Sequence, residues 1–382
     1  MSNTAFISTN WLELENLERF LVILLSQKIN LTVERLEIVQ EFYGDLETAF
    51  KKNFNELRIK HKWLLKLPAQ TTESAITEIQ TIQESLKKHD ISSCIYSFDE
   101  YPIDFKHLSD APSVIYYRGN WGLIKSPPKI TIVGSRNLNH YSESIVNKIL
   151  KPALEMNQSL VTVSGLALGI DALAHQISLE AGIKTIGIIG SGLDKNSFYP
   201  SANWNLCENI INSNGLVISE YPPLTKATVY SFPRRNRLLA CLSKLTWVVS
   251  ASIKSGSLIT ARLANEFGNT VATTPANILD SNHLGNLELL KNGANIISEP
   301  QDILDLMNLN SYKINQISET IDLTFLSDDQ KLVYEALSFE AINIDILSEK
   351  LNFETNYLIS NLTLLELSGI AINTGENNWQ KN

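Results

Sequence analysis

Apolar residues recur along the chain in three different patterns, which divide it into parts. Over residues 11–89 they return every three to four positions, as at Leu17, Leu21 and Leu24, and that spacing is typical of one face of an α-helix. We therefore predict a small helical domain over residues 1–96.

Short runs of β-branched and other apolar residues alternate with amphipathic stretches from Lys129 onward. The runs cover residues 130–133, 160–163, 185–189, 216–218, 246–249 and 270–273. Such alternation predicts βαβ units and a parallel sheet buried on both faces, hence an α/β domain over residues 97–306. Small or polar residues follow each run. In such a sheet they would meet at its carboxyl edge, where open α/β folds bind ligands.

A third pattern follows a polar linker, which we predict over residues 307–321. Apolar residues such as Val333, Leu347 and Leu362 again recur at helical spacing, and a short apolar stretch over residues 370–372 follows them. We expect three short helices closed by a small hairpin. Residues 322–382 are therefore predicted to form a winged-helix-like domain.

Composition and cysteine content exclude several classes of protein. The chain of 382 residues is 44% hydrophobic and 19% charged, which is typical of a folded globular protein. The apolar run at residues 20–25 is far shorter than the roughly 20 residues of a membrane span, so a cytoplasmic protein without membrane contact is expected. Cys94, Cys207 and Cys241 lie far apart with no histidine cluster beside them. Neither a disulfide nor a metal site is expected.

The net charge of -9 is unevenly distributed. Residues 129–300 carry 14 basic and 11 acidic residues, whereas residues 301–382 carry 4 basic and 13 acidic ones. A winged helix of that acidity is a poor candidate for binding a phosphate backbone. We interpret it as a protein-interaction module or an internal electrostatic decoy, and the sheet domain as the only basic part.

The first candidate anion site is the end of the first apolar run, at Gly134, Ser135 and Arg136. Glycine permits a tight turn, free N–H groups ahead of a helix favour anions, and arginine can bind an anion through two hydrogen bonds. A turn glycine beside a surface arginine remains an open interpretation of the same residues.

The second run leads into a turn that contains Ser164, Gly165 and Gly169. It resembles the phosphate-binding turns of nucleotide folds, but the GxGxxG fingerprint is absent, so no nicotinamide or flavin cofactor is expected. Asp171 and His175 lie four residues apart on one helix face, either as an acid–base dyad or as a pair that buttresses the loop. Without a serine or cysteine nucleophile beside them, buttressing is the favoured interpretation.

The most informative segment is Phe232, Arg234, Arg235, Asn236 and Arg237. Burying that much unpaired charge is costly, so these side chains are expected to face solvent or an anionic ligand. An aromatic ring among arginines suits single-stranded nucleic acid, because a base can stack on the ring for about 1–3 kcal/mol while guanidinium groups hold phosphates.

A further loop places Lys254, Ser255, Gly256 and Ser257 at the start of another helix. Serine hydroxyls and exposed backbone N–H groups would form an anion cradle beside the lysine. Three such loops at one edge of the sheet predict an extended track for a polyanion.

Together these motifs resemble the DNA-processing protein A family, DprA/Smf, over about residues 97–300. The chain departs from the family pattern at Ser250, where an acidic residue is usual, and at Ala276, where glycine is usual. The resemblance implies an extended Rossmann-like domain between a SAM-like helical domain and a winged-helix-like domain. By position, the residues that match the DNA-contacting part of the family pattern are Arg136, Phe232, Arg235, Asn236, Arg237, Lys254 and Ser255.

The resemblance also implies a function. It predicts a homodimeric, non-enzymatic mediator that protects incoming single-stranded DNA and helps to load the RecA recombinase during natural transformation. One alternative is a nucleotide phosphoribohydrolase, since similar Rossmann-like domains cleave nucleoside monophosphates, although the PGGxGTxxE loop of those enzymes is absent. Another is a nucleotide-sensing module that binds mononucleotides tightly and oligonucleotides not at all.

Overall fold

The computed structural model describes residues 21–25, 27, 31–52, 54–62, 64, 72–125, 128–309, 326–338, 341–375 and 377–381. The chain divides into two compact units, residues 1–312 and residues 313–382. The predicted linker lies outside the described residues beyond position 309, and so does the start of the predicted helical domain.

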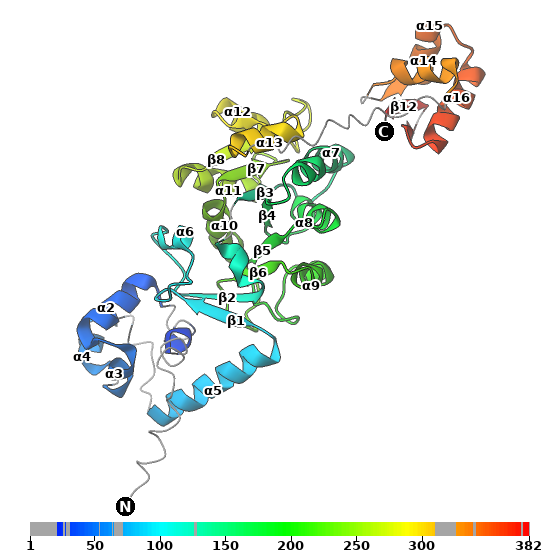
Figure 1. Ribbon diagram of the computed structural model, residues 1–382. Helices are drawn as coiled ribbons and strands as arrows, with labels where there is room; N and C mark the ends of the chain where they lie inside the picture. Colours follow the sequence, from blue (N-terminus) through cyan, green and yellow to red (C-terminus); the bar gives the residue numbers. More distant parts are fainter. Residues whose placement is uncertain are drawn as a thin grey trace, which may run out of the picture. The chain divides into compact units, whose positions relative to one another are not determined.

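A nine-stranded sheet forms the centre of the first unit (Figure 1). The strands are β1 (Ser92–Ile95), β2 (Val114–Gly119), β3 (Lys129–Val133), β4 (Val161–Ser164), β5 (Thr185–Ile189), β6 (Leu216–Ser219), β7 (Leu245–Val248), β8 (Thr270–Thr273) and β9 (Asn295–Ile296). Their spatial order is β1-β2-β6-β5-β4-β3-β7-β8-β9. All six predicted apolar runs are strands, and they pair in parallel from β6 to β8.

Two antiparallel strands extend the sheet at the β6 edge. β2 pairs with β6, and β1 pairs with β2. The sheet therefore begins at Ser92, within the stretch that was predicted to be helical up to residue 96. The segment before β2 holds a short helix, α6 (Ile103–Lys106), and the 3₁₀ turn η2 (Trp121–Ile124) follows β2.

Helices cover both faces of the sheet. Figure 1 shows α7 (His140–Met156), α8 (Ile170–Glu180) and α9 (Trp204–Asn212) on one side and α10 (Ser231–Leu242) and α11 (Gly256–Glu266) on the other. The alternation of side chains along the strands explains this: Ile130 and Ile132 pack in one buried cluster with residues of α7 and α8. Ile186 and Ile188 pack in another, with Leu238 of α10. This is the α/β, Rossmann-like architecture that the sequence predicts.

The remaining helices of this unit lie at the two ends of its sequence. α12 (Leu284–Lys291) and α13 (Pro300–Leu306) follow β8 and β9. Before the sheet come α2 (Val33–Tyr43), α3 (Leu46–Lys51), α4 (Asn55–Lys60) and α5 (Thr72–Lys88), as the helical spacing predicts. Their buried residues, such as Leu36 and Leu57, form one cluster with Ile95 and Tyr116 of the sheet.

The second unit has its own core. Its elements are α14 (Asp328–Ala336), β10 (Ile342–Asn343), α15 (Ile344–Leu351), α16 (Thr355–Leu367), β11 (Ala371–Gly375) and β12 (Asn378–Lys381). Val333, Leu347, Leu362 and Trp379 are buried together. The three predicted helices and the C-terminal hairpin are present, and β10 pairs with β12 to complete a three-stranded antiparallel sheet.

No helix in the described part of the chain is both long enough and apolar enough to pass through a lipid bilayer.

Candidate nucleic-acid interface

The strand order of the sheet changes direction between β3 and β7. From β3 the chain proceeds outward through β4, β5 and β6, and then returns to the other side of β3 with β7 and β8. The loops after β3 and β7 therefore diverge and leave a crevice at the carboxyl ends of these strands. Open α/β sheets bind ligands at such a crevice.

A pocket of about 360 Å³ lies at this position, and we refer to it as the switch-point pocket. Its volume is within the range of small-molecule sites. The structure brings ten of the predicted site residues to its wall: Gly134, Ser135, Arg136, Asp171, Phe232, Arg235, Asn236, Ser255, Gly256 and Ser257.

Arg136 and Phe232 form the mouth of the switch-point pocket. Arg136 is exposed, and its guanidinium carbon lies 5.2 Å from the centre of the Phe232 ring, within the range of a cation–π contact. No carboxylate of the described residues forms a salt bridge with Arg136. The cation is thus oriented by an aromatic ring rather than neutralised by an acid, which leaves its N–H groups for an anion.

Gly169 lets two of the predicted loops touch. Its φ is +79°, and a Cβ there would collide with the carbonyl oxygen of Ser135. The N–H of the next residue, Ile170, donates to the same carbonyl at 3.1 Å. Glycine is therefore required both for the left-handed backbone and for the close approach that holds the loop after β3 in place.

Arg235 lies inside the protein and also lines the switch-point pocket. Nη1 donates to the carbonyls of Gly165, at 2.6 Å, and of Ile188, and Nε donates to Asn236 Oδ1 at 3.2 Å. A Cβ on Gly165 would overlap this guanidinium. Burial lowers the pKa of Arg235 to about 10, with the nearby carboxylate of Asp171 acting in the opposite direction. Nη2 forms no hydrogen bond with any described residue, so it can donate into the pocket.

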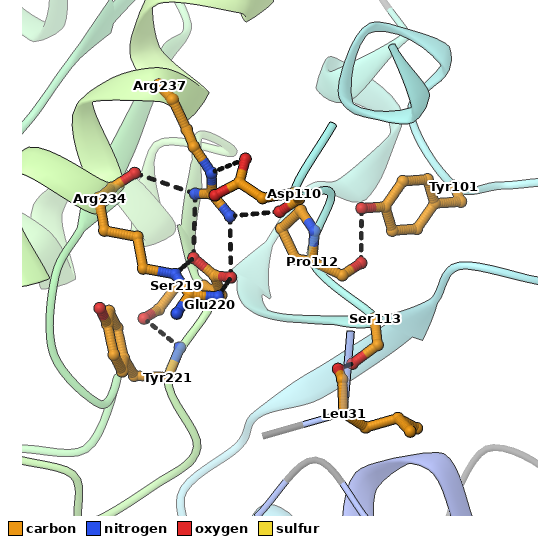
Figure 2. A network of polar contacts seen from close by, with 10 residues as sticks. All are labelled: Leu31, Tyr101, Asp110, Pro112, Ser113, Ser219, Glu220, Tyr221, Arg234 and Arg237. Atoms are coloured by element: carbon orange, nitrogen blue, oxygen red, sulfur yellow. Dashed lines mark hydrogen bonds and ion pairs between the residues drawn. The ribbon is translucent and has the colours of Figure 1, made fainter. Parts of the chain in front are cut away.

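Arg237 is fully occupied by other protein groups (Figure 2). Nε donates to Asp110 Oδ1 at 2.8 Å, Nη1 to Glu220 Oε2 at 3.0 Å and to the Arg234 carbonyl at 2.9 Å. Nη2 donates to the Asp110 carbonyl and to Glu220 Oε1, both at 2.9 Å. A guanidinium has five N–H groups, and all five are used.

The prediction that the whole arginine segment faces solvent or an anionic ligand is therefore wrong for Arg237, which has no donor left for a phosphate. Arg235 and Asn236 are also buried, 6% and 8% exposed, although both line the pocket. Arg234 donates twice to Glu220, at 3.2 and 2.7 Å, and its side chain is 37% exposed. The carboxylates of Asp110 and Glu220 compensate the charge of the buried Arg237, and both lie far from it in the sequence.

The loop after β7 forms another wall. Ser255 caps α11 by accepting from the N–H of Ser257, and the two hydroxyls lie 2.5 Å apart. Asn236 Nδ2 donates to the carbonyl of Gly256 at 3.2 Å and so connects α10 to this loop. Lys254 is exposed but lines a neighbouring groove against α11 rather than the switch-point pocket.

Ser164, Asp171 and His175 are all buried, and of the three only Asp171 lines the switch-point pocket. Asp171 Oδ2 accepts from the N–H of Gly165 at 3.1 Å, the contact that buttressing of this loop requires. Burial raises the pKa of Asp171, whereas Arg235 lowers it.

His175 Nδ1 lies 2.7 Å from the Thr185 hydroxyl, and burial lowers the pKa of His175 to about 3. No hydrogen bond joins Asp171 to His175 in the described structure, so the geometry does not form an acid–base dyad. Ser164 donates to the Ile132 carbonyl at 2.6 Å and does not line the switch-point pocket.

Comparison with known proteins identifies this arrangement. The pattern of the family described as DNA recombination-mediator protein A matches residues 93–308, more than half of the chain. The chain belongs to this family. Membership of this family assigns the chain a general role as a mediator of DNA recombination.

Named relatives and solved structures agree with this assignment. The DNA processing protein DprA of Streptococcus pneumoniae is 41% identical over 206 residues, which cover 54% of this chain and 71% of the relative. The DNA processing protein DprA of Bacillus subtilis is 34% identical over 233 residues, which cover 61% of this chain and 77% of the relative. The crystal structure of the Streptococcus pneumoniae protein superposes with a TM-score of 0.54 at 36% identity, over 62% of this chain and 83% of that one.

A second solved structure concerns a ligand. It is a structure of DNA processing protein A from Helicobacter pylori, and it concerns how that protein binds single-stranded DNA. It superposes with a TM-score of 0.50 at 31% identity and covers 57% of this chain and 95% of that one.

Of the two positions at which the sequence departs from the family pattern, Ser250 has a local explanation. Ser250 is buried at the end of β7, and its hydroxyl accepts from the N–H of Ser135 at 3.3 Å. A hydroxyl thus supports the loop after β3 where the family usually has a carboxylate. Nothing in the structure explains the alanine at position 276.

Some residues in and beside the switch-point pocket are not found by reading the sequence. Asn137 and Asn282 line the switch-point pocket, but a single amide residue in a loop gives neither periodicity nor charge. Tyr199 lies beside Phe232, with ring centres 5.5 Å apart. It was not among the predicted site residues.

Proposed function

We propose that this chain binds single-stranded DNA along the carboxyl edge of its sheet, with a phosphate held at Arg136 and a base against Phe232. The observation that carries the proposal is the exposed guanidinium of Arg136, which lies over an aromatic ring at the mouth of a pocket and has no salt bridge with the described residues. Single-strand binders combine cations for phosphates with aromatic rings for bases. The ligand named for the Helicobacter pylori relative supports the same assignment.

The loops after β4 and β7 complete the proposed site. Arg235 of α10 lines the switch-point pocket together with Ser255 and Ser257, and Lys254 extends the positive charge beyond it. The wall of Gly165, Gly169 and Asp171 supports Arg235 and the loop after β3. The acidic pairing of Arg237 gives it a different role, which is to fix α10.

Fluorescence anisotropy with labelled single- and double-stranded oligonucleotides over a salt series tests this proposal. We expect the single strand to bind more tightly, with log affinity falling by about 0.7 per log unit of salt for each phosphate neutralised. A folded sample without affinity for single strands at low salt would refute the proposal.

We also propose that the chain acts on RecA as a homodimer, protecting single strands and passing them to the recombinase. The family assignment supports this. The test is the rate of RecA filament formation on single strands covered with single-strand-binding protein, followed by ATP hydrolysis, with and without this chain. We expect a shorter lag, and sedimentation should give twice the monomer mass.

A mononucleotide is a second candidate ligand, because the switch-point pocket has the volume of a small-molecule site. Incubation with nucleoside monophosphates separates the possibilities: released base indicates a phosphoribohydrolase, and calorimetric binding without cleavage indicates a nucleotide sensor. For a DNA-binding mediator that is not an enzyme we expect neither cleavage nor tight binding.

A further inference from the structure

The cationic mouth of the switch-point pocket continues into a second recess on its β5 side. Arg136, Phe232 and Arg235 line both spaces, so the two are contiguous. The second recess is otherwise lined by apolar and small residues, among them Leu168, Tyr199 and Pro200. None of the described residues that line it is acidic. We call this surface the Tyr199 shelf.

Tyr199 presents an accessible ring on this shelf. The residue is 48% exposed, and its ring lies against Phe232 at 5.5 Å with an interplanar angle of 54°. Its hydroxyl forms no hydrogen bond with the described residues. Leu168 is also 45% exposed beside it. The Tyr199 ring and Leu168 therefore offer an accessible apolar surface beside the guanidinium of Arg136.

The backbone around Tyr199 is held firmly. The N–H of Tyr199 donates to the Ser191 hydroxyl at 3.2 Å. Four residues later, Asn203 Nδ2 donates to the carbonyls of Leu166 and Ala167 at 2.9 and 3.0 Å. The ring is therefore positioned relative to the loop after β4 before any ligand binds, which reduces the entropy lost on binding.

The dimensions of the recess determine how a ligand would use it. Its volume is about 20 Å³, close to the space for one water molecule, so a nucleobase cannot enter it. A base can instead lie on the outer face of the Tyr199 ring. Because Arg136 occupies a place over Phe232, the phosphate that follows this base would meet a guanidinium.

Resting on the proposed function, we infer that the Tyr199 shelf is a second base-stacking site for single-stranded DNA. The strand passes from the switch-point pocket over Arg136 and Phe232, and its next base stacks on Tyr199. The contact is to the face of a base and not to its edge, so it does not depend on sequence. It adds affinity only for ligands longer than the switch-point pocket accommodates.

The test compares the full-length chain with its Tyr199→Ala and Tyr199→Phe variants in anisotropy measurements on thymidine oligonucleotides of increasing length. Tyr199→Ala should weaken binding of long oligonucleotides about 5- to 150-fold, as expected for loss of one stacked base. Tyr199→Phe should bind within about twofold of the unchanged chain, because the ring is retained. The salt slope should stay the same, since no phosphate contact is removed.

Length dependence separates this inference from an indirect effect. Binding of a dinucleotide should be unaffected by Tyr199→Ala, whereas an equal loss at every length would mean that the variant disturbs the switch-point pocket and would overturn the inference. Tyr357→Ala is the matched control, because Tyr357 is 47% exposed and belongs to the other unit. Circular dichroism checks that each variant is folded.

Photocrosslinking gives a direct readout. An oligonucleotide with 5-iodouracil in place of thymine should crosslink to Tyr199, identified by mass spectrometry of the digested complex. Long oligonucleotides that bind the Tyr199→Ala variant as tightly as the unchanged chain would refute the shelf and leave the proposed function intact. Failure of the unchanged chain to bind any oligonucleotide would instead refute the proposed function itself.

Discussion

At the scale of single residues, the arginines of the interface differ in what their guanidinium groups are free to do. Arg136 is exposed and lies over an aromatic ring, Arg235 lines the pocket and has one nitrogen without an acceptor among the described residues, and Arg237 has none available. Proximity in sequence therefore says little about their roles. The number of N–H groups left without a protein acceptor is the better guide.

Arg136→Ala should weaken binding of single-stranded DNA about 10- to 150-fold, because a hydrogen bond to a charged group contributes about 1.5–3 kcal/mol. The salt slope should fall by about 0.7, the contribution of one phosphate. Lys151→Ala removes the same charge from an exposed position near the far end of α7 and should change neither quantity. An unchanged slope for Arg136→Ala would remove Arg136 from the phosphate contacts.

Arg237→Ala should instead lower stability and leave the salt slope unchanged. The variant leaves Glu220, whose side chain is 10% exposed, with Arg234 as its remaining partner. Loss of one member of a buried ion pair costs on the order of 3 kcal/mol, which urea unfolding would measure. A flattened salt slope in the folded variant would show that Arg237 contacts phosphate after all.

His175 should make the protein less stable in acid. Burial lowers its pKa to about 3 in the folded state, whereas an unfolded histidine has a pKa of about 6.5. Between these values the unfolded chain binds a proton that the folded chain does not, so the free energy of unfolding decreases as the pH falls. Urea unfolding at pH 5 and pH 7 should show a smaller difference in His175→Gln than in the unchanged chain. His140→Gln, at an exposed position, is the control.

At the scale of secondary-structure elements, the buried parallel strands were predictable and the edge strands were not. β3 to β7 are rich in β-branched and other apolar residues, and all of their residues are buried because helices cover both faces of the sheet. β1 has the sequence Ser-Ser-Cys-Ile, and β2 lies in a segment rich in tyrosine. β2 pairs with β6, which is about 100 residues away in sequence, and local patterns contain no information about such contacts.

At the interface, too, features marked by the local sequence were predictable, whereas contacts between distant residues were not. The loops after β3, β4 and β7 were predictable, because the end of each strand is marked by glycine or serine. The burial of Arg237 was not, because its carboxylate partners Glu220 and Asp110 follow β6 and precede β2 (Figure 2). Tyr199 was not assigned because its neighbour in space, Phe232, lies 33 positions further along the chain.

Contact between the loops after β3 and β4 should be essential for DNA binding. Gly169→Ala places a Cβ against the Ser135 carbonyl and forces alanine to a φ of +79°. We expect it to lose most oligonucleotide affinity and about 1–3 kcal/mol of stability. Gly182→Ala is the matched control, because φ is +69° but no atom lies within 4 Å of the added Cβ. It should cost about 1 kcal/mol and leave the affinity unchanged. Equal affinities for the two variants would contradict the role of this contact.

At the scale of the whole molecule, the net charge is negative although residues 129–300 of the sheet domain carry more basic than acidic residues. Residues 313–382 carry four basic and eleven acidic residues, and this unit has a separate core. Because like charges repel, an acidic unit attached to a DNA-binding one should reduce the affinity for a polyanion at low salt. A chain of residues 1–312 should therefore bind single-stranded DNA more tightly than the full chain in dilute buffer. The difference should disappear near 0.5 M salt, where charges are screened within about 4 Å. If removal of residues 313–382 instead weakens binding at all salt concentrations, these residues contact the DNA themselves despite their net negative charge.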